Sequence, residues 1–328
     1  MKMKNIFRRA AWLGCFATAC SFAQSASAAD DYPNKPIHLV VPWSVGGFND
    51  MLARLLAEKM STSMGQQIIV ENRPGAAGTL GSEYVARAKP DGYTLLLATA
   101  DTHAISKAIF AHLRYDPQRD FTPISLIVSQ PVILWVSSES DTKNFADLLK
   151  KAKENPGKVS YASNGAGSVT HLGMESFAKA ANISLLHVPY KGSGPAMIDL
   201  MGNRVDAMFM SIQAAGSQAT SGKLTPLAVT AEKRVPAMPN VPTFTEAGIP
   251  FKLALWQGLV APKGVPADIV NRLAQESAKA LKSPEIMERM QPLGVDVIAS
   301  DPATFKESLA KEITEWKEIA DELGVQLD

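Results

Sequence analysis

Two glycine-containing loops carry the residue types best suited to holding an anion. The first covers residues 42–50 (PWSVGGFND) and joins an expected strand to the start of an expected helix. Its glycines, Gly46 and Gly47, let a ligand approach the main chain closely. The free N–H groups at a helix start, aided by the helix dipole, favour a negative charge. The alternative interpretation is an ordinary tight turn, and this loop alone does not decide between the two.

The second loop covers residues 163–172 (SNGAGSVTHL) and also follows an expected strand and opens an expected helix. Ser168 or Thr170 could cap that helix or turn a hydroxyl group toward a bound oxygen. The loop lacks the Gly-Lys-Ser/Thr of a phosphate-binding loop, the third glycine of a dinucleotide fingerprint and the serine between glycines of an esterase. Ligands in open α/β sheets sit at the carboxyl ends of strands. Two such loops on facing lobes could therefore hold one carboxylate between them.

The titratable residues form no recognisable catalytic or metal-binding set. The histidines lack metal-ligand spacing, and Asp101, Asp199 and Asp206 fit helix caps or ion pairs better than acid–base catalysts. Ser168 and His171 are a suggestive pair for a nucleophile and its base, but helix capping explains them equally well. We therefore expect no catalytic residue, no metal site and no cofactor.

The first 28 residues have the features of a secretory signal peptide. Four basic residues lie within the first nine, an uncharged and largely apolar stretch covers 10–23, and Ala26-Ser27-Ala28 supplies a small-residue cleavage site. The apolar stretch is too short to span a membrane, which takes about 20 residues. We expect cleavage near Ala28 and release into the periplasm, with lipid attachment at Cys20 as the alternative.

Composition after cleavage points to a two-lobe protein without thiol chemistry. Both cysteines, Cys15 and Cys20, lie in the leader, so disulfides, cysteine catalysis and thiolate metal sites are excluded. Removing 28 of 328 residues leaves 300, which is more than one core readily organises. Removing four of the 33 basic residues leaves 29 against 32 acidic ones, a net charge of −3. Such a balance predicts no nucleic-acid partner.

Strand-like and helix-like segments alternate along the chain, which predicts an α/β fold with parallel sheets. The expected strands cover residues 37–41, 68–70, 94–98, 132–136, 159–162, 185–188, 207–210 and 224–229. The expected helices start at 50 and cover 145–153, 169–181 and 195–201, and two more begin at Ser283-Pro284 and Asp301-Pro302, the last ending at Gly324.

No flexible linker divides the chain, so the two lobes must share their connections. We expect crossings near 123–129 and 227–231. The prediction is that lobe 1 contains residues 29–125 and 230–328, and that lobe 2 contains 126–229, with the ligand cleft between them.

Ordered motifs cover nearly the whole mature chain. They are Tyr32-Pro33-x-Lys35-Pro36-Ile37, Pro42-Trp43-x-x-Gly46-Gly47-x-x-Asp50, Ala53-Arg54, Val70-Glu71-Asn72-Arg73-Pro74-Gly75-Ala76, Lys89-Pro90-Asp91-Gly92-Tyr93-Thr94, Tyr115-Asp116-Pro117, Asp120-Phe121-x-Pro123-Ile124, Gly167-Ser168-x-x-His171-Leu172, Val188-Pro189-Tyr190-Lys191-Gly192 and Trp256-x-Gly258-Leu259-x-Ala261-Pro262. With these motifs the chain resembles the Bug family, the TctC-like periplasmic solute-binding receptors of tripartite tricarboxylate transporters. The resemblance implies a Venus-flytrap fold of two lobes that hold one ligand carboxylate between the two loops, partly through ordered water.

Carried over to this sequence, the resemblance adds side chains to the two loops. Combined with the aromatic residues of the first loop, the expected ligand-binding residues are Trp43, Gly46, Gly47, Phe48, Asn49, Asp50, Thr102, His103, Asn164, Gly165, Ser168, Tyr190 and Asp206. Three features depart from the family pattern: Phe48, Asp101 and the pair Ser106-Lys107. A ring at Phe48, supported by Trp43, would favour an apolar or aromatic ligand body, unless Phe48 packs beneath the loop; Asp101 would instead pair with a ligand amine.

The function expected from the sequence is capture of a small organic carboxylate, either a di- or tricarboxylate or an aromatic acid. The ligand would then pass to membrane transporter subunits that the protein, expected as a monomer, meets transiently. Two alternatives stay open: a periplasmic sensor read by a membrane signalling partner, and an exported hydrolase built on Ser168 and His171.

Overall fold

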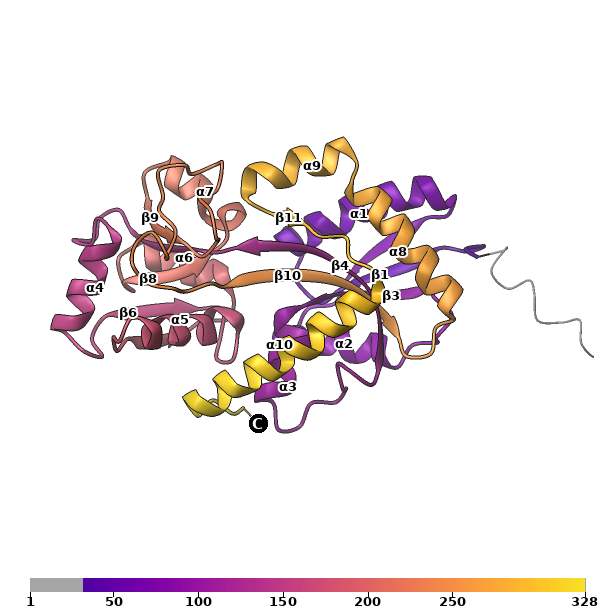
Figure 1. Ribbon diagram of the computed structural model, residues 1–328, viewed down its shortest axis with the longest axis horizontal. Coiled ribbons are helices and arrows are strands. Elements are labelled where there is room, and N and C mark those ends of the chain that lie inside the picture. The colour runs from indigo at the N-terminus through magenta and orange to yellow at the C-terminus, as the bar shows by residue number, and fades with distance from the viewer. Residues whose placement is uncertain (1–31, 328) are drawn as a thin grey trace, which may run out of the picture.

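The computed structural model describes residues 32–327, so the signal-peptide assignment to residues 1–28 lies outside the described part. Two separate β-sheets, each accompanied by helices, form two lobes (Figure 1). The lobe 1 sheet has the order β11-β4-β10-β3-β1-β2, and the lobe 2 sheet has the order β7-β6-β8-β5-β9. The α/β class and the two-lobe architecture expected from the sequence are therefore confirmed.

The strand bounds follow the predicted alternation closely up to β9, with the exception of β4, which was not predicted. In lobe 1 they are β1 Ile37–Val41, β2 Ile68–Asn72, β3 Thr94–Thr99, β4 Phe121–Pro131, β10 Ala254–Pro262 and β11 Asp296–Val297. In lobe 2 they are β5 Ile133–Ser137, β6 Ser160–Ser163, β7 Leu186–Pro189, β8 Ala207–Met210 and β9 Leu224–Val229.

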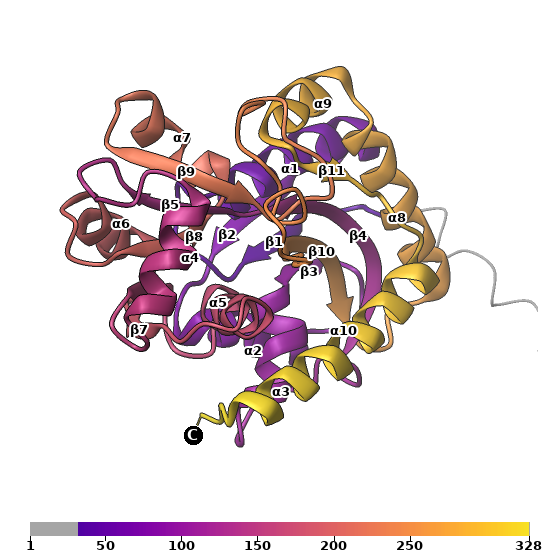
Figure 2. The ribbon, with the colours of Figure 1, turned by 60° about the vertical axis from the view of Figure 1, so that its left-hand side comes forward.

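The helices complete the layers around the two sheets (Figure 2). Those of lobe 1 are α1 Phe48–Met64, α2 Thr79–Ala86, α3 Ser106–Ile109, α8 Ala267–Leu281, α9 Pro284–Met290 and α10 Pro302–Leu323, with the short turns η1 Ala76–Gly78, η2 Asp101–Ile105 and η3 Gln291–Leu293. Those of lobe 2 are α4 Phe145–Glu154, α5 Val169–Ala180, α6 Ser193–Met201 and α7 Ile212–Thr220. No helix among residues 32–327 is both long enough and apolar enough to cross a membrane.

Both sheets are mixed, which corrects the expectation of parallel sheets. β1 pairs in parallel with β2 and β3, and β6 pairs in parallel with β7 and β8. However, β10 runs antiparallel to both β3 and β4, and β5 runs antiparallel to β8 and β9. The reason is topological, since a chain that leaves a lobe along one strand must return along another in the opposite direction. The sequence predicted neither β4, the strand that leaves lobe 1, nor β10, the strand that returns to it, nor the short β11.

The two crossings lie further along the chain than the sequence indicated. β4 continues to Pro131 and β5 begins at Ile133, so the expected boundary at residue 125 falls inside β4. The segment after β9 stays with lobe 2, because Phe244 lies in an aromatic cluster, 5.1 Å from the ring of Phe177. The strands thus divide the described chain into lobe 1, residues 32–131 and 254–327, and lobe 2, residues 132–253.

A buried threonine joins both crossings. The Thr230 hydroxyl accepts a hydrogen bond from the Val132 N–H group at 3.0 Å and can donate to the Leu253 carbonyl at 2.5 Å. The Thr230 N–H group donates to the Val132 carbonyl at 2.9 Å. The point where the chain enters lobe 2 and the point where it leaves are therefore tied by one side chain.

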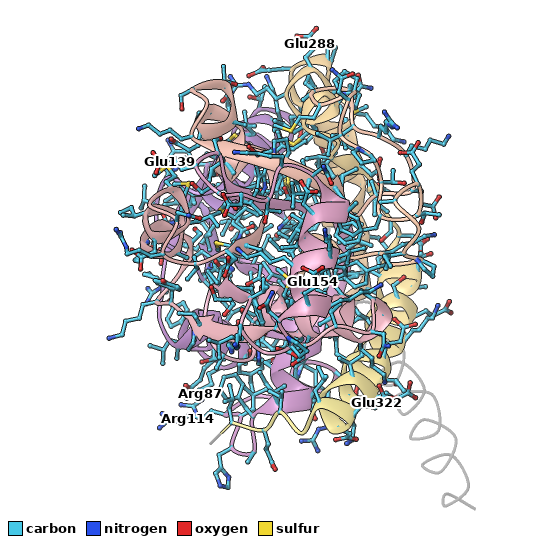
Figure 3. The ribbon with its side chains drawn as sticks, turned by 90° about the vertical axis from the view of Figure 1, so that its left-hand side faces the viewer. Arg87, Arg114, Glu139, Glu154, Glu288 and Glu322 are labelled. Atoms are coloured by element: carbon cyan, nitrogen blue, oxygen red, sulfur yellow. The ribbon has the colours of Figure 1, made fainter. Side chains whose placement is uncertain are left out.

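Exposed charged side chains surround both lobes. Figure 3 labels Arg87, Arg114, Glu139, Glu154, Glu288 and Glu322, all of them exposed. Both signs occur on this rim, in keeping with the near balance of charge in the sequence.

Replacing Thr230 by valine should weaken the hinge. Valine keeps the shape but leaves the buried Val132 N–H group without its hydroxyl acceptor, which costs about 1–3 kcal/mol. Urea unfolding of Thr230→Val should show this loss. The matched control is Thr314→Val on the exposed face of α10, and its free energy of unfolding should stay near that of the parent. Equal stability of the two variants would contradict the assignment of Thr230 as the tie between the crossings.

Candidate ligand-binding site

The carboxyl ends of the parallel strands bring the predicted loops to two facing edges. In lobe 1, residues 42–50 follow β1 and η2 follows the neighbouring β3. In lobe 2, the 163–172 loop follows β6 and Tyr190 follows the neighbouring β7. The Val169 N–H group of lobe 2 donates to Oδ1 of Asp101 in lobe 1 at 2.9 Å. The edge that receives ligands in open α/β sheets is therefore turned toward the other lobe on both sides.

The first loop exposes its main chain. Residues 44–47 are exposed, and Gly46 has φ +87° with open space where a side chain would lie. Gly47 has φ −82° and extended backbone, so a side chain there would not be strained. The conformational need for glycine thus falls on Gly46, whereas Gly47 serves by leaving room above the main chain.

Asp50 organises this loop from inside. Its Oδ2 accepts the Gly46 N–H group at 3.0 Å, and Arg54 holds both carboxylate oxygens at 2.9 and 3.1 Å. Burial disfavours the charged carboxylate, but the hydrogen bonds from Arg54 and Gly46 outweigh it and hold the pKa of Asp50 below its usual value. We conclude that Asp50 fixes the loop geometry through Oδ2, while the buried Oδ1 faces Arg54 but has no hydrogen-bond partner within the described chain.

The start of α1 has polar groups without hydrogen-bond partners in the described chain. Gly47 occupies the cap position, and no side chain of the described residues caps this helix. The buried Oδ1 of Asn49 and the buried Nε1 of Trp43 also have no hydrogen-bond partner within the described chain. An acceptor placed over this loop would therefore find main-chain donors that the protein leaves uncapped.

Most main-chain amides of the second loop are hydrogen-bonded to side chains of the same loop or of the first turn of α5. The Gly165 N–H group donates to Ser163 Oγ at 3.1 Å, and the Gly167 N–H group donates to His171 Nδ1 at 3.1 Å. The Asn164 N–H group is likewise bonded, to a hydroxyl group in the first turn of α5. The two loops therefore do not both offer free main-chain donors, because the amides of the second loop are mostly hydrogen-bonded within the chain.

Ser168 acts as the cap of α5. Its Oγ accepts the His171 N–H group at 3.3 Å and donates to the Gly165 carbonyl at 2.7 Å. The His171 ring stacks on His187 with centroids 3.9 Å apart. These contacts match the capping interpretation of Ser168 and His171, in which the hydroxyl group and the ring hold the loop in shape.

The lobes also touch beside this loop. A side chain at Gly167 would collide with Ile109 of α3 and with Leu327, and Gly167 has φ +76°, so only glycine fits. Lys179 of α5 forms an ion pair with Glu322 of α10 across the same seam. Both ends of α5 thus contact lobe 1, the start through Val169 and the last turn through Lys179.

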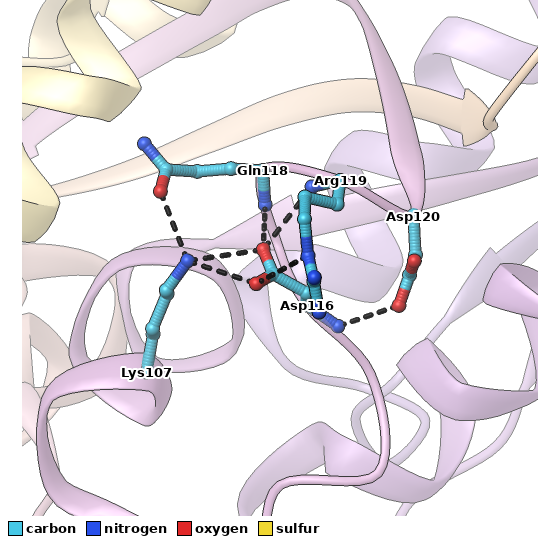
Figure 4. Close-up of polar contacts among 5 residues, drawn as sticks. All are labelled: Lys107, Asp116, Gln118, Arg119 and Asp120. Carbon is cyan, nitrogen blue, oxygen red and sulfur yellow. Dashed lines mark hydrogen bonds and ion pairs between the residues drawn. The ribbon is translucent and has the colours of Figure 1, made fainter.

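A polar cluster fixes α3 at this seam (Figure 4). Lys107 Nζ lies 3.1 and 3.0 Å from the two carboxylate oxygens of Asp116 and 3.0 Å from Gln118 Oε1. Asp116 also accepts from Arg119, while its own N–H group donates to Asp120 at 2.7 Å. Burial opposes ionisation, but Lys107 and the loop amides hold the pKa of Asp116 below its usual value. Lys107, a departure from the family pattern, thus has a local structural role.

Thr102 and His103 lie inside lobe 1 and present no surface to a ligand. Thr102 Oγ1 accepts the Thr99 N–H group at 3.0 Å. The fully buried His103 ring packs on Phe121 at a centroid distance of 4.5 Å, and burial lowers the pKa of His103 to about 3. The η2 turn therefore points both side chains back into the core, although it lies at the expected edge.

Asp206 lies at the opposite edge of its sheet, which corrects its expected place in the cleft. It precedes β8 and accepts from the Ser160 N–H group at 2.8 Å, at the start of the parallel strand β6. Lys151 pairs with it at 2.8 Å. Tyr190, by contrast, follows β7 at the carboxyl edge, and its hydroxyl group donates to Asp199 at 2.7 Å.

Phe48 lies beneath the loop, as its alternative interpretation had it. It is buried in the lobe 1 core together with Leu52 and Leu56 of the same helix. Trp43 is partly buried and packs against that core, and its carbonyl accepts from Asn72 at 3.1 Å. In this conformation the rings support the loop and do not line its exposed side.

The sequence did not single out Glu312 on α10. Its carboxylate accepts from the indole N–H groups of Trp256 and of Trp316, the latter at 3.0 Å. Burial raises the pKa of Glu312 to about 7 against these hydrogen bonds, and the charges of Glu315 and Asp101 add to the rise. The one available signal was the Trp256-x-Gly258 motif. That motif gave no indication of a partner for Trp256 on α10.

Within residues 32–327 no three histidine, cysteine, aspartate or glutamate side chains come together in a way that could hold a metal ion.

The comparisons with known proteins agree with this architecture. The model of the tripartite tricarboxylate transporter family receptor (TctC) matches residues 52–325, so the chain belongs to that family. It is similar to the periplasmic binding protein BugD, with 37% identity, TM-score 0.81, and coverage of 90% of this chain and 99% of BugD. It is also similar to two Rhodopseudomonas palustris proteins: Rpa4515 with adipate (34%, TM-score 0.84, 90% and 99%) and MatC with bound malate (33%, 0.79, 88% and 99%).

Membership of this family settles the broad class. The chain is a solute-binding protein of the TctC and Bug type and not an enzyme. The exported-hydrolase alternative is therefore set aside, in line with the capping contacts of Ser168.

Glu312→Gln should stabilise the protein more at alkaline than at acidic pH. The folded-state pKa of about 7 lies above the usual 4.5, so the charged form is disfavoured in the fold. The parent loses stability as pH rises from about 4.5 through about 7, while glutamine stays neutral. We expect Glu312→Gln to gain about 1–2 kcal/mol over the parent at pH 8, allowing for partial exposure, and little at pH 5. Thermal unfolding at both pH values measures this, and a gain independent of pH would contradict it.

Proposed function

We propose that this protein is a periplasmic receptor that captures a small organic carboxylate and delivers it to the membrane subunits of a tripartite tricarboxylate-type transporter. The observation that carries the proposal is the exposed Gly46–Gly47 main chain at the uncapped start of α1, on the edge that faces lobe 2. A carboxylate leaving water must regain hydrogen bonds, each worth about 1.5–3 kcal/mol when charge-assisted. Both facing edges belong to one chain, so a monomer suffices.

The two lobes contribute differently to this proposed site. In the first loop Asp50 accepts the Gly46 N–H group and holds the geometry, so the donors offered to a ligand are the uncapped amides at the start of α1, with Asn49 beside them. The second loop, whose amides are largely bonded within the chain, would contribute shape and the exposed Asn164 side chain, with Tyr190 on the next strand end. A ligand carboxylate would therefore be held mainly by lobe 1 and enclosed by lobe 2.

Names and descriptions of relatives support the transport role. The family description is that of a transporter receptor, which favours delivery over the sensing alternative. Two similar proteins are described with adipate and with malate, both small carboxylates. The basic residues and apolar stretch at the start of the sequence fit export, as does the likeness to the periplasmic protein BugD.

Binding should be detectable by a thermal-shift screen of small carboxylates against the mature protein. A ligand that binds only the folded state raises the midpoint temperature of unfolding. At a ligand concentration a hundredfold above Kd, the stabilisation is about 2.7 kcal/mol. Adipate and malate serve as first probes, with hexylamine and glucose as controls that lack a carboxylate. Failure of every carboxylate in a broad panel to shift the midpoint would overturn the proposal.

Gly47→Val should impair that binding much more than Ser168→Ala. At φ −82° with the nearest atom, the Ser44 carbonyl oxygen, 3.9 Å from an added Cβ, valine fits the fold but blocks approach to the main chain. We expect at least about a tenfold loss of affinity, or about 1.4 kcal/mol. Ser168→Ala removes a helix cap and should cost about 0.5–2 kcal/mol of stability while changing affinity little. Titration calorimetry decides, and unchanged binding by a folded Gly47→Val would place the ligand elsewhere.

A further inference from the structure

One carboxylate of the protein already occupies the amide end of α5. Asp101, the first residue of η2 in lobe 1, accepts the N–H group of Val169 in lobe 2 at 2.9 Å. Val169 is the first residue of α5, directly after the cap Ser168. A helix start carries partial positive charge and attracts anions. The chain thus supplies, from the opposite lobe, the kind of group that a ligand would otherwise bring.

The start of α1 shows the contrast. No side chain of the described residues caps α1, and its loop is exposed at Gly46 and Gly47. Of the two facing helix starts, one is open to an anion and the other is already served by Asp101. The site is therefore asymmetric, with room for one anionic group on the lobe 1 side.

The charges around Asp101 reinforce this asymmetry. Glu312 is close enough to Asp101 that the charge of Asp101 contributes to raising the pKa of Glu312. The lysines of the flanking helices, Lys107 of α3 and Lys179 of α5, are paired with Asp116 and Glu322. Neither lysine is free to neutralise a further negative charge. Burial raises the pKa of Asp101, and the hydrogen bond from Val169 opposes that rise. A second anion brought beside Asp101 would meet an amide that is already bonded, and repulsion from the carboxylate whenever it is ionised.

We propose that Asp101 determines ligand specificity by excluding a second carboxylate from the α5 side. The proposal rests on the proposed function and narrows its ligand class. The ligand has one carboxylate, held at the α1 loop, and an opposite end that is neutral or positively charged. This chain then differs from its relatives described with adipate and malate, which are dicarboxylates.

The test compares ligand pairs that differ in a single carboxylate. Titration calorimetry would measure adipate against hexanoate and against 6-aminohexanoate, and malate against 2-hydroxybutanoate, for the parent protein, Asp101→Asn and Asp101→Ser. Asparagine keeps an oxygen that accepts from Val169 and removes only the charge. Serine also withdraws the acceptor and frees the amide. The control is Asp301→Asn, which changes a carboxylate that caps a helix start at 2.9 Å within lobe 1.

We expect the parent and Asp301→Asn to prefer the monocarboxylate of each pair. Asp101→Asn should shift the ratio of affinities toward the dicarboxylate by at least about tenfold, and Asp101→Ser by as much or more. The ratio separates specificity from structure, because a mere loss of interlobe contact weakens both ligands of a pair alike.

Three results would overturn the inference. If both Asp101 variants bind carboxylates with the parental ratio, or weaken both members of each pair equally, Asp101 only joins the lobes and the proposed function stands. If the parent already prefers dicarboxylates, Asp101 does not exclude them. If neither the parent protein nor any variant binds a carboxylate, the proposed function fails and the inference fails with it.

Discussion

The hydroxyl group of Thr230 joins the two chain segments that connect lobe 1 to lobe 2. It is hydrogen-bonded to Val132, where the chain enters lobe 2, and to Leu253, the last residue before the chain returns to lobe 1. Because the two crossings are tied, the strands on either side cannot drift apart independently. This connection and the contacts of α5 with lobe 1 together hold the two sheets, and the loops at their carboxyl ends, toward each other.

From that connection the two loops acquire different duties. The loop after β1 is shaped from inside by Asp50 and keeps its main chain exposed. The loop after β6 is rigid because hydroxyl groups and the His171 ring accept its amides. An open donor surface in lobe 1 and a preformed wall in lobe 2 suit capture by one lobe and enclosure by the other. Preorganisation of this kind reduces the ordering cost of binding.

The seam between α5 and lobe 1 adds a second constraint. Asp101, Gly167 and the Lys179–Glu322 pair bring α5 against η2, α3 and α10. A carboxylate from one lobe at the helix start of the other is favourable locally through the helix dipole. It also places an ionisable carboxyl group where a ligand would be enclosed, although burial raises the pKa of Asp101, and the same residue that joins the lobes is therefore expected to influence ligand choice.

The sequence by itself determined the local elements. The alternation of apolar segments predicted all five strands of the lobe 2 sheet and β1, β2 and β3 of the lobe 1 sheet. The Asp301-Pro302 start and Gly324 end of α10 also hold in the structure, because capping and periodicity depend on residues a few positions apart. Only the tertiary structure decided which edge a residue occupies. Asp206 lies at the amino edge, His103 turns into the core, and Asp101 meets Val169, 68 residues further along the chain. Such contacts depend on how the sheets cross and face each other, and no local pattern encodes that distance in space.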